Sequence, residues 1–310
     1  MSTPSKILAI VGPTASGKTP LALLLGKQLN GEVISADSRQ IYRFMDIGTA
    51  KPTAEERLVV PHHLIDLLDP AQEYSAGQFL RDAQEAVRAV QERGRLPMLV
   101  GGSGLYVRAF IDGLFAGPGK DPQIREELEE QLRARGAAWL LEELRRIDPV
   151  AAASADPTKP RRIIRALEVY RITGQPLSEL QRTEHTRPPY GVHQYALEWD
   201  RAVLYGIIEE RVDRMMESGL LQEVRSLMER GYDLRCNAMN TVGYKELFRH
   251  LQSEIDLDEA VALIKRNTKR FAKRQFTWFR ADKRIIWKRL RNLDDLGAVA
   301  DSIVAEFQRN

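Results

Sequence analysis

The chain of 310 residues has very little cysteine and no long apolar run, and both shortages narrow the protein classes to which it can belong. The single cysteine, Cys236, cannot form an intrachain disulfide or a multi-cysteine zinc site. No apolar stretch approaches the roughly 18 residues of a membrane span. The N-terminal Met-Ser-Thr-Pro-Ser-Lys lacks the apolar core of a signal peptide. The sequence therefore predicts a globular, cytoplasmic protein without a membrane partner.

Positive and negative charges nearly balance over the whole chain, but they are unevenly distributed along it. The formal net charge is +3, whereas residues 265–291 contain twelve Lys and Arg and one acid, Asp282, which leaves −8 for the remainder. Such a block is typical of a nucleic-acid partner, and a solvated amphipathic helix is the alternative. The aromatic residues within the block are expected to pack in the core rather than against bases: Phe271, Phe276, Trp278, Phe279 and Trp287.

The most specific motif occupies residues 12–19 and matches G-x-x-x-x-G-K-[ST], directly after the apolar run 7–11. A strand that enters a glycine-rich turn before a helix directs backbone N–H groups and the helix dipole at one point, which predicts a phosphate or diphosphate site. Lys18 supplies a full positive charge, and the Thr19 hydroxyl can ligate Mg²⁺. A purely structural turn is the alternative. The motif consists of Gly12, Pro13, Thr14, Ala15, Ser16, Gly17, Lys18 and Thr19.

The order of apolar and turn-forming segments predicts an α/β fold: a P-loop NTPase-like core, with a parallel sheet flanked by helices, plus an all-helical insertion domain. Strands are expected at 7–11, 32–35, 63–68, 96–100 and 195–199. Core helices are expected at 21–29, 75–93, 202–217, 220–231, 245–251, 257–281 and 296–307, and insertion helices at 124–135, 138–146 and 161–173. The expected domains are 1–117 with 188–310, and 118–187.

Polar residues follow two of the predicted strands, at the edge where ligands bind in parallel sheets. Asp37 follows the second strand and could ligate Mg²⁺, act as a general base or cap the next segment. Ser103 follows the strand 96–100 within Gly-Gly-Ser-Gly, where the glycines allow a ligand to approach the backbone or form a tight turn. The absence of an acidic residue at this strand end argues against a plain ATPase.

The expected insertion helix 161–173 begins with clustered arginines. Arg161 and Arg165 are four residues apart and share one helix face. Clustered guanidinium groups suit bidentate contacts to phosphates, whereas salt bridges to the acidic segment Glu126–Glu130 are the alternative.

Eight segments along nearly the whole chain together resemble the tRNA dimethylallyltransferase (tRNA isopentenyltransferase) family of the bacterial type. The segments are 12–19, 35–40, 45–52, 61–66, 101–106, 165–170, 242–245 and 272–280. The chain departs from the family in having Ser103 where Thr is frequent and Pro20 in place of a small helix former. It also lacks the Cys/His spacing of the zinc finger found in some eukaryotic relatives.

The resemblance implies transfer of a dimethylallyl group from dimethylallyl diphosphate to N6 of the adenosine immediately 3′ of the anticodon. It implies Asp37, Ser103, Lys18 and Arg211 as catalytic residues and Mg²⁺ on Thr19, with a monomer acting on the anticodon stem-loop. The tRNA contacts it implies are Asp37, Ser38, Arg39, Gln40, Ser103, Arg125, Arg161, Arg162, Ile163, Ile164, Arg165, Gly243, Tyr244, Lys245, Gln275, Trp278 and Arg280.

Three other functions compete with this one. A P-loop small-molecule kinase leaves the basic block 265–291 without a role. An adenylate isopentenyltransferase would act on free adenine nucleotides, and the arginines of the insertion favour tRNA instead. A non-catalytic RNA-binding module leaves the intact P-loop unexplained.

Overall fold

The computed structural model describes residues 5–114, 117–183 and 190–309, and these form two compact units. The first unit combines 1–111 with 189–310, and the second comprises 112–188. The sequence places the boundaries at 117/118 and 187/188, and the second of these, with most of the expected linker 183–190, lies outside the described residues. Among the described helices, none has the length and apolar character needed to span a lipid bilayer.

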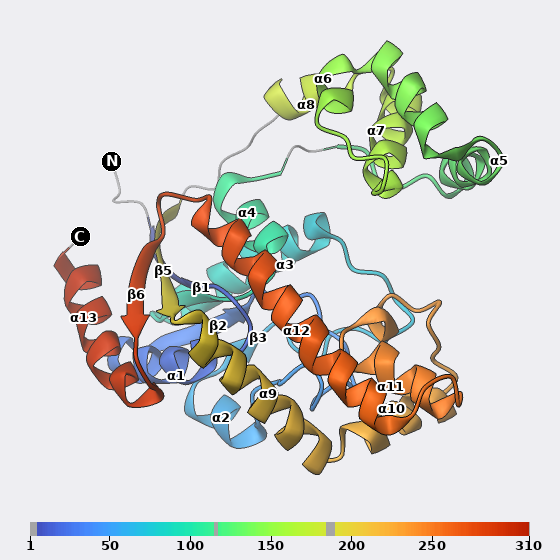
Figure 1. The fold of residues 1–310 in the computed structure, drawn as a ribbon. Coiled ribbons are helices and arrows are strands. Elements are labelled where there is room, and N and C mark those ends of the chain that lie inside the picture. Colours follow the sequence, from blue (N-terminus) through green and yellow to red (C-terminus); the bar gives the residue numbers. More distant parts are fainter. Residues whose placement is uncertain (1–4, 115–116, 184–189, 310) are drawn as a thin grey trace. The chain divides into compact units, whose positions relative to one another are not determined.

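The first unit is built on one six-stranded sheet with the order β3-β2-β4-β1-β5-β6, in which every pair of neighbours is parallel (Figure 1). This confirms the predicted α/β fold with a parallel sheet. The strands are β1 (Ser5–Val11), β2 (Gly31–Ser35), β3 (His62–His63), β4 (Leu96–Gly101), β5 (Tyr190–Trp199) and β6 (Ile286–Leu290).

Two strands differ from the sequence-based prediction. The expected strand 63–68 shrinks to the two residues of β3, because Leu64 and Asp66 have positive φ angles of 62° and 57° that end the extended backbone. β6 lies within the basic block, whose charges obscured its short apolar pattern. Its pairing with β5 supplies the sixth strand.

The central strand β1 is buried on both faces because helices cover both sides of a parallel sheet. Leu8 and Ile10 point into one apolar layer, and the alternating residues Ile7, Ala9 and Val11 point into the other. The first layer packs under α1 (Lys18–Leu29) and α13 (Leu296–Arg309), and the second under α3 (Ala76–Glu92) and α4 (Gly104–Asp112). α3 begins with a capping box between Ser75 and Gln78.

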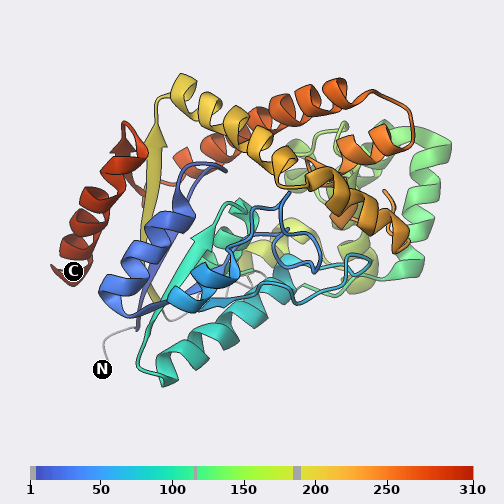
Figure 2. The ribbon, with the colours of Figure 1, turned by 90° about the horizontal axis from the view of Figure 1, so that it is seen from below.

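A third apolar cluster lies beyond the carboxyl ends of the strands, where four helices meet the segment that follows β2. α9 and α12 run side by side in Figures 1 and 2 and carry the side chains that face the site. The four helices are α9 (Arg201–Glu217), α10 (Leu220–Glu229), α11 (Tyr244–Leu251) and α12 (Leu257–Arg280), with a short 3-10 helix at Ala238–Asn240. Elsewhere in the unit, α2 (Ala54–Val59) contacts α1, and a 3-10 helix at Leu293–Asp295 precedes α13.

The regular elements in the described part of the second unit are all helices. Its elements are α5 (Pro122–Ile147), α6 (Pro149–Ala153), α7 (Pro160–Thr173) and α8 (Leu177–Thr183). Asp121 caps α5, and Gly136, with φ of 81°, kinks this helix where the sequence predicts two separate helices. The apolar side of α7 packs against α5, so the unit has its own core.

Candidate active site

The loop 12–19 joins β1 to α1 in the conformation that a phosphate-binding loop requires. Gly12 and Gly17 have φ angles of 129° and 94°, which residues with a side chain rarely adopt. Pro20 lies in the first turn of α1, where no backbone donor is needed. Trp199 Nε1 donates to the carbonyl of Ser16 at 2.9 Å and thereby holds the loop against the end of β5. The backbone N–H groups at the start of α1 are therefore preset for an anion.

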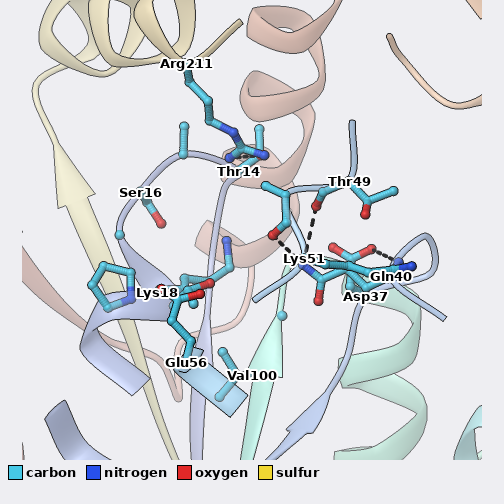
Figure 3. A pocket seen from close by; sticks show the side chains of 16 residues that line it. Thr14, Ser16, Lys18, Asp37, Gln40, Thr49, Lys51, Glu56, Val100 and Arg211 are labelled. Atoms are coloured by element: carbon cyan, nitrogen blue, oxygen red, sulfur yellow. Dashed lines mark hydrogen bonds between the residues drawn. The ribbon is translucent and has the colours of Figure 1, made fainter. Parts of the chain in front are cut away.

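Two cations converge above this loop, as Figure 3 shows. Arg211 reaches down from α9 and donates to Thr14 Oγ1 at 3.2 Å, while Lys18 Nζ donates to the carbonyl of Pro13 at 2.6 Å. Burial lowers the pKa of Lys18 to about 8; Asp37 opposes this shift and Arg211 adds to it. Burial also lowers the pKa of Arg211. Positive charge that is costly to bury calls for an anionic ligand between these two groups.

The space in front of the loop is a pocket of about 340 Å³. The hydroxyl of Ser16 is buried beside it and has no hydrogen-bond partner among the described residues. Thr19 also lines the pocket, and its hydroxyl makes no hydrogen bond within the described part of the chain. We call this space the phosphate pocket; its remaining walls are Asp37, Gln40, Thr49, Ala50, Lys51, Glu56, Val100, Gly101 and Arg211.

A second pocket of about 300 Å³ adjoins the first, and Thr14, Asp37, Thr49 and Arg211 line both. This second pocket has polar walls from the ends of β2 and β4 and apolar walls from α9 and α12. Its other lining residues are Ser38, Arg39, Gly48, Ser103, Ile208, Val212, Met215, Leu220, Asn240, Thr241, Val242, Gly243, Lys245, Ile264, Thr268, Phe271 and Arg274.

Asp37 lies where the two pockets meet. Its Oδ1 accepts the backbone N–H groups of Arg39 at 2.8 Å and Gln40 at 3.4 Å, so the carboxylate does cap the turn after β2. Its Oδ2 has no hydrogen-bond partner in the described ranges. One side chain thus combines the capping interpretation with a carboxylate oxygen available to a ligand.

The Ser103 hydroxyl lies beside Asp37 in the second pocket. Its oxygen accepts the backbone N–H of Ser38 at 2.9 Å, so its own proton can still be donated. The N–H of Ser103 in turn donates to the carbonyl of Ala36 at 3.1 Å. These two bonds join the ends of β2 and β4, which brings Ser38, Ser103 and Asp37 together as the sequence predicts.

The glycines around Ser103 make room for protein rather than for a ligand. A Cβ on Gly101 would lie 2.1 Å from the carbonyl oxygen of Ala36, one on Gly102 2.4 Å from Gln275 Nε2, and one on Gly104 2.3 Å from the ring of Trp278. Gln275 is buried; it accepts the N–H of Thr14 at 2.8 Å and donates to the carbonyl of Gly102 at 2.9 Å. The predicted tRNA contact at Gln275 is therefore corrected, because both ends of its amide are used to join α12 to the P-loop.

Two further predicted tRNA contacts have internal partners. The Gln40 amide donates to the carbonyls of Thr49 at 3.4 Å and Ala50 at 3.1 Å, and it accepts from the Ser35 hydroxyl at 3.1 Å. Tyr244 is fully buried and its hydroxyl donates to Glu223. The structure therefore contradicts a contact of Tyr244 with tRNA, since no part of its side chain is accessible.

The other predicted contacts in the first unit line the second pocket or are exposed. Arg39 lines the second pocket and donates to the carbonyl of Asn237 at 2.8 Å. Gly243, with φ of 100°, and Lys245 line the same pocket. Trp278 is exposed, and Arg280 pairs with Glu198 at 3.0 Å.

The basic block 265–291 is partly neutralised by acidic neighbours. Lys265 pairs with Asp213, and Lys269 pairs with Glu209. Further ion pairs in the block join Arg280 to Glu198, Arg284 to Asp282, Lys288 to Glu306, and Arg291 to Asp295. The expectation that the aromatic residues pack in the core holds for Phe279 and is wrong for Phe271 and Trp278, each of which is 40% exposed.

In the second unit the clustered arginines divide into two groups. Arg125 and Arg165 both pair at 2.8 Å with Glu168, whose carboxylate is buried, so the partner differs from the expected acidic segment. Arg161 and Arg162 are exposed and form no ion pair within the described residues. Ile163 and Ile164 lie in the core of this unit, which contradicts a contact of their side chains with tRNA.

Sequence reasoning missed one wall of the second pocket. Ile264, Thr268 and Phe271 recur at helical spacing along α12, on the same face as Gln275. Their spacing alone indicates a common face of α12, but the lysines and arginines between them mask this pattern in the sequence. The segment 46–51, also part of the pocket walls, has no local signal beyond its membership of a motif.

Two family patterns match the chain: IPP transferase over residues 40–282 and Isopentenyl transferase over residues 5–63. The tRNA dimethylallyltransferase of Pelotomaculum thermopropionicum is 45% identical over 298 residues, which are 96% of this chain and 95% of the relative. That of Carboxydothermus hydrogenoformans is 49% identical over 91% of both chains.

Solved structures give the same result. The tRNA isopentenylpyrophosphate transferase of Bacillus halodurans superposes with a TM-score of 0.73 at 43% identity, covering 98% of this chain and 97% of that one. A eukaryotic dimethylallyltransferase acting on tRNA superposes with a TM-score of 0.83 at 27% identity, covering 99% of this chain and 80% of its own.

Proposed function

Because the chain belongs to the tRNA dimethylallyltransferase family, it attaches a dimethylallyl group to an adenosine of tRNA, and we propose that the two joined pockets perform this transfer. The donor is dimethylallyl diphosphate, and the acceptor is N6 of the adenosine immediately 3′ of the anticodon. The phosphate pocket takes the diphosphate. The second pocket takes the adenine, and we call it the adenine pocket.

The shared wall of the pockets is the observation that supports this assignment most strongly. Thr14, Arg211 and Asp37 each line both pockets. Thr14 and Arg211 adjoin the site of the diphosphate, and Asp37 faces the site of the adenine. An acceptor nitrogen and a donor carbon that enter from opposite sides would therefore meet beside a carboxylate. Holding two reactants in this way removes much of the entropic barrier of a bimolecular reaction.

The chemistry then needs a base and a site for the leaving group. As the bond between N6 and C1 forms, the bond between C1 and the diphosphate oxygen breaks, and its electron pair leaves with the diphosphate. Lys18, Arg211 and the backbone N–H groups of the P-loop stabilise that developing charge. The N6 proton passes to Asp37, whose Oδ2 has no hydrogen bond to the described residues, while Ser103 orients the base from the same pocket.

A magnesium ion would assist by neutralising the diphosphate when it is bound. Mg²⁺ retains several waters and typically uses one or two protein oxygens together with substrate phosphates. Thr19 fits this requirement, since it lines the phosphate pocket and its hydroxyl has no hydrogen-bond partner in the described parts of the chain. The described residues contain no cluster of three or more His, Cys, Asp or Glu, so the protein would hold the ion together with the substrate rather than in a cage of its own.

The exposed arginines of the second unit are suited to the phosphates of the RNA stem. Arg161 and Arg162 carry charge without an ion-pair partner among the described residues, and the core beneath them fixes their helix. Guanidinium groups bind phosphate oxygens in a bidentate manner. On α12, Arg274 lines the adenine pocket, and Trp278 is exposed one helical turn further along.

One incubation tests the proposed donor and acceptor. The protein is mixed with labelled dimethylallyl diphosphate and Mg²⁺, and bulk tRNA, AMP and ATP are supplied in separate reactions. We expect label in tRNA alone, located by nucleoside analysis at the adenosine 3′ of the anticodon. Label in AMP or ATP would indicate an adenylate isopentenyltransferase, and phosphoryl transfer from ATP without prenylation would indicate a kinase.

A further inference from the structure

The segment Asp46–Lys51, which we call the wall, contributes to the lining of both pockets and shares Thr49 between them. Gly48 and Thr49 line the adenine pocket, whereas Thr49, Ala50 and Lys51 line the phosphate pocket. Ala50 has a φ angle of 48°, which is unfavourable for a residue with a side chain. A wall with such a backbone keeps its shape only when other parts of the protein hold it.

The wall is held from one side by a carboxylate on α10. Glu223 accepts the backbone N–H groups of Asp46 at 2.9 Å, Ile47 at 2.8 Å and Gly48 at 3.2 Å. The hydroxyl of Tyr244 donates to the same carboxylate at 2.6 Å. Four donors to one carboxylate form an unusually complete set of charge-assisted hydrogen bonds.

Tyr244 also fixes the wall by packing. A Cβ on Gly48 would lie 2.4 Å from Cε2 of the tyrosine ring, so the backbone lies directly on the ring. Burial and the neighbouring Glu223 raise the pKa of Tyr244 well above 10, so the hydroxyl keeps its proton. Ring and carboxylate therefore act on the same stretch of backbone.

The other side of the wall is held by residues close to it in sequence. The Gln40 amide binds the carbonyls of Thr49 and Ala50, as described above. The buried ammonium of Lys51 donates to the carboxylates of Asp46 and Asp66. Glu223 and Tyr244, by contrast, come from distant helices, Glu223 lying 175 positions after Gly48, and line neither pocket.

We infer that Glu223 and Tyr244 are positioning residues for prenyl transfer, which act by holding the wall Asp46–Lys51 so that the two substrates meet at a fixed distance. This inference rests on the proposed function. The P-loop sets diphosphate affinity, and the basic surfaces set tRNA affinity. A displaced wall therefore changes the approach of N6 to C1, and a displacement of about 1 Å can lower the rate by roughly 10²-fold.

The test compares Tyr244→Phe with Tyr232→Phe. The Tyr232 hydroxyl also donates to a carboxylate, that of Asp69, at 2.6 Å, and both tyrosines contribute to the same apolar cluster. We expect Tyr244→Phe to lower the single-turnover rate at saturating substrates by about 10- to 100-fold. The KM for dimethylallyl diphosphate and the Kd for tRNA should stay within about twofold, and Tyr232→Phe should keep the wild-type rate.

Two results with the phenylalanine variants would overturn the inference. Equal rates for the two phenylalanine variants would mean that Tyr244 contributes only stability. A weaker tRNA Kd for Tyr244→Phe with an unchanged rate at saturation would mean that Tyr244 acts on RNA binding. Glu223→Gln provides a second variant, and adding Tyr244→Phe to it should cause little further loss, because both substitutions act through one carboxylate. If the rate losses of the two single variants multiplied in the double variant, the two residues would act independently, which would contradict the inference.

Amide hydrogen exchange separates failure of the inference from failure of the proposed function. Glu223→Gln should accelerate exchange at Asp46, Ile47 and Gly48, because their N–H groups lose a charged acceptor. This readout requires no activity. Unchanged exchange would refute the inference, whereas a wild-type enzyme that does not prenylate tRNA would refute the proposed function.

Discussion

The pKa of Lys18 predicts an alkaline limit to the use of dimethylallyl diphosphate. Burial in the phosphate pocket lowers this pKa to about 8, so about nine-tenths of the free enzyme carries the Lys18 proton at pH 7 and about one-tenth at pH 9. If only the protonated form binds the diphosphate productively, kcat/KM should fall about tenfold between these values. Because kcat/KM reports ionisation of the free enzyme, the midpoint should lie near pH 8.

The assay measures kcat/KM for dimethylallyl diphosphate at saturating tRNA from pH 6 to pH 10. Bound diphosphate favours the charged form of Lys18, so the fall in kcat should appear at higher pH than the fall in kcat/KM. Lys18→Arg is the matched variant, because a guanidinium stays charged across this range. Its kcat/KM is expected to be lower than that of the wild type at neutral pH and not to fall near pH 8. A wild-type profile that stays flat to pH 10, or an unchanged fall near pH 8 in Lys18→Arg, would refute the reasoning.

Three further predictions concern packing and charge. Gly102→Ala should displace the buried amide that joins α12 to the P-loop and lower the unfolding free energy by about 1–3 kcal/mol in a denaturant titration, whereas Gly297→Ala, with open space around it, should not destabilise. Arg165→Ala should cost about 1–3 kcal/mol in the same titration, because it removes a partner of a buried carboxylate. Arg161→Glu with Arg162→Glu should reduce the log–log salt slope of tRNA binding by about two units, and an unchanged slope would exclude both from phosphate contact.

Local patterns predicted the parts of the molecule that depend on local physics. The P-loop follows from spacing, because glycines at 12 and 17 permit two of the three positive φ angles of the turn, the third being at Ala15. The parallel sheet follows from apolar runs separated by amphipathic helices. The predicted strand 63–68 was wrong beyond His63, because the positive φ angles at Leu64 and Asp66 end the extended backbone.

The sequence could not show which site residues support the site and which face a ligand, because their hydrogen-bond partners are distant along the chain. Gln275 bonds to Thr14 across 261 positions, and Glu223 bonds to Gly48 across 175. A family motif groups residues that serve one site, but it does not say which side chains face the ligand. Gln275 and Tyr244 face inward, and only the packing of α12 and α11 reveals this.

The most direct measurement of how the joined pockets work is the single-turnover rate of Asp37→Asn. Asparagine retains the shape of the side chain and can still accept the N–H groups of Arg39 and Gln40, but it cannot take up the N6 proton at neutral pH. We predict a rate lower by about 10²–10⁴-fold, with tRNA affinity within a few-fold of wild type. A rate close to wild type, with or without a loss of tRNA affinity, would contradict the role of Asp37 as the base where donor and acceptor meet.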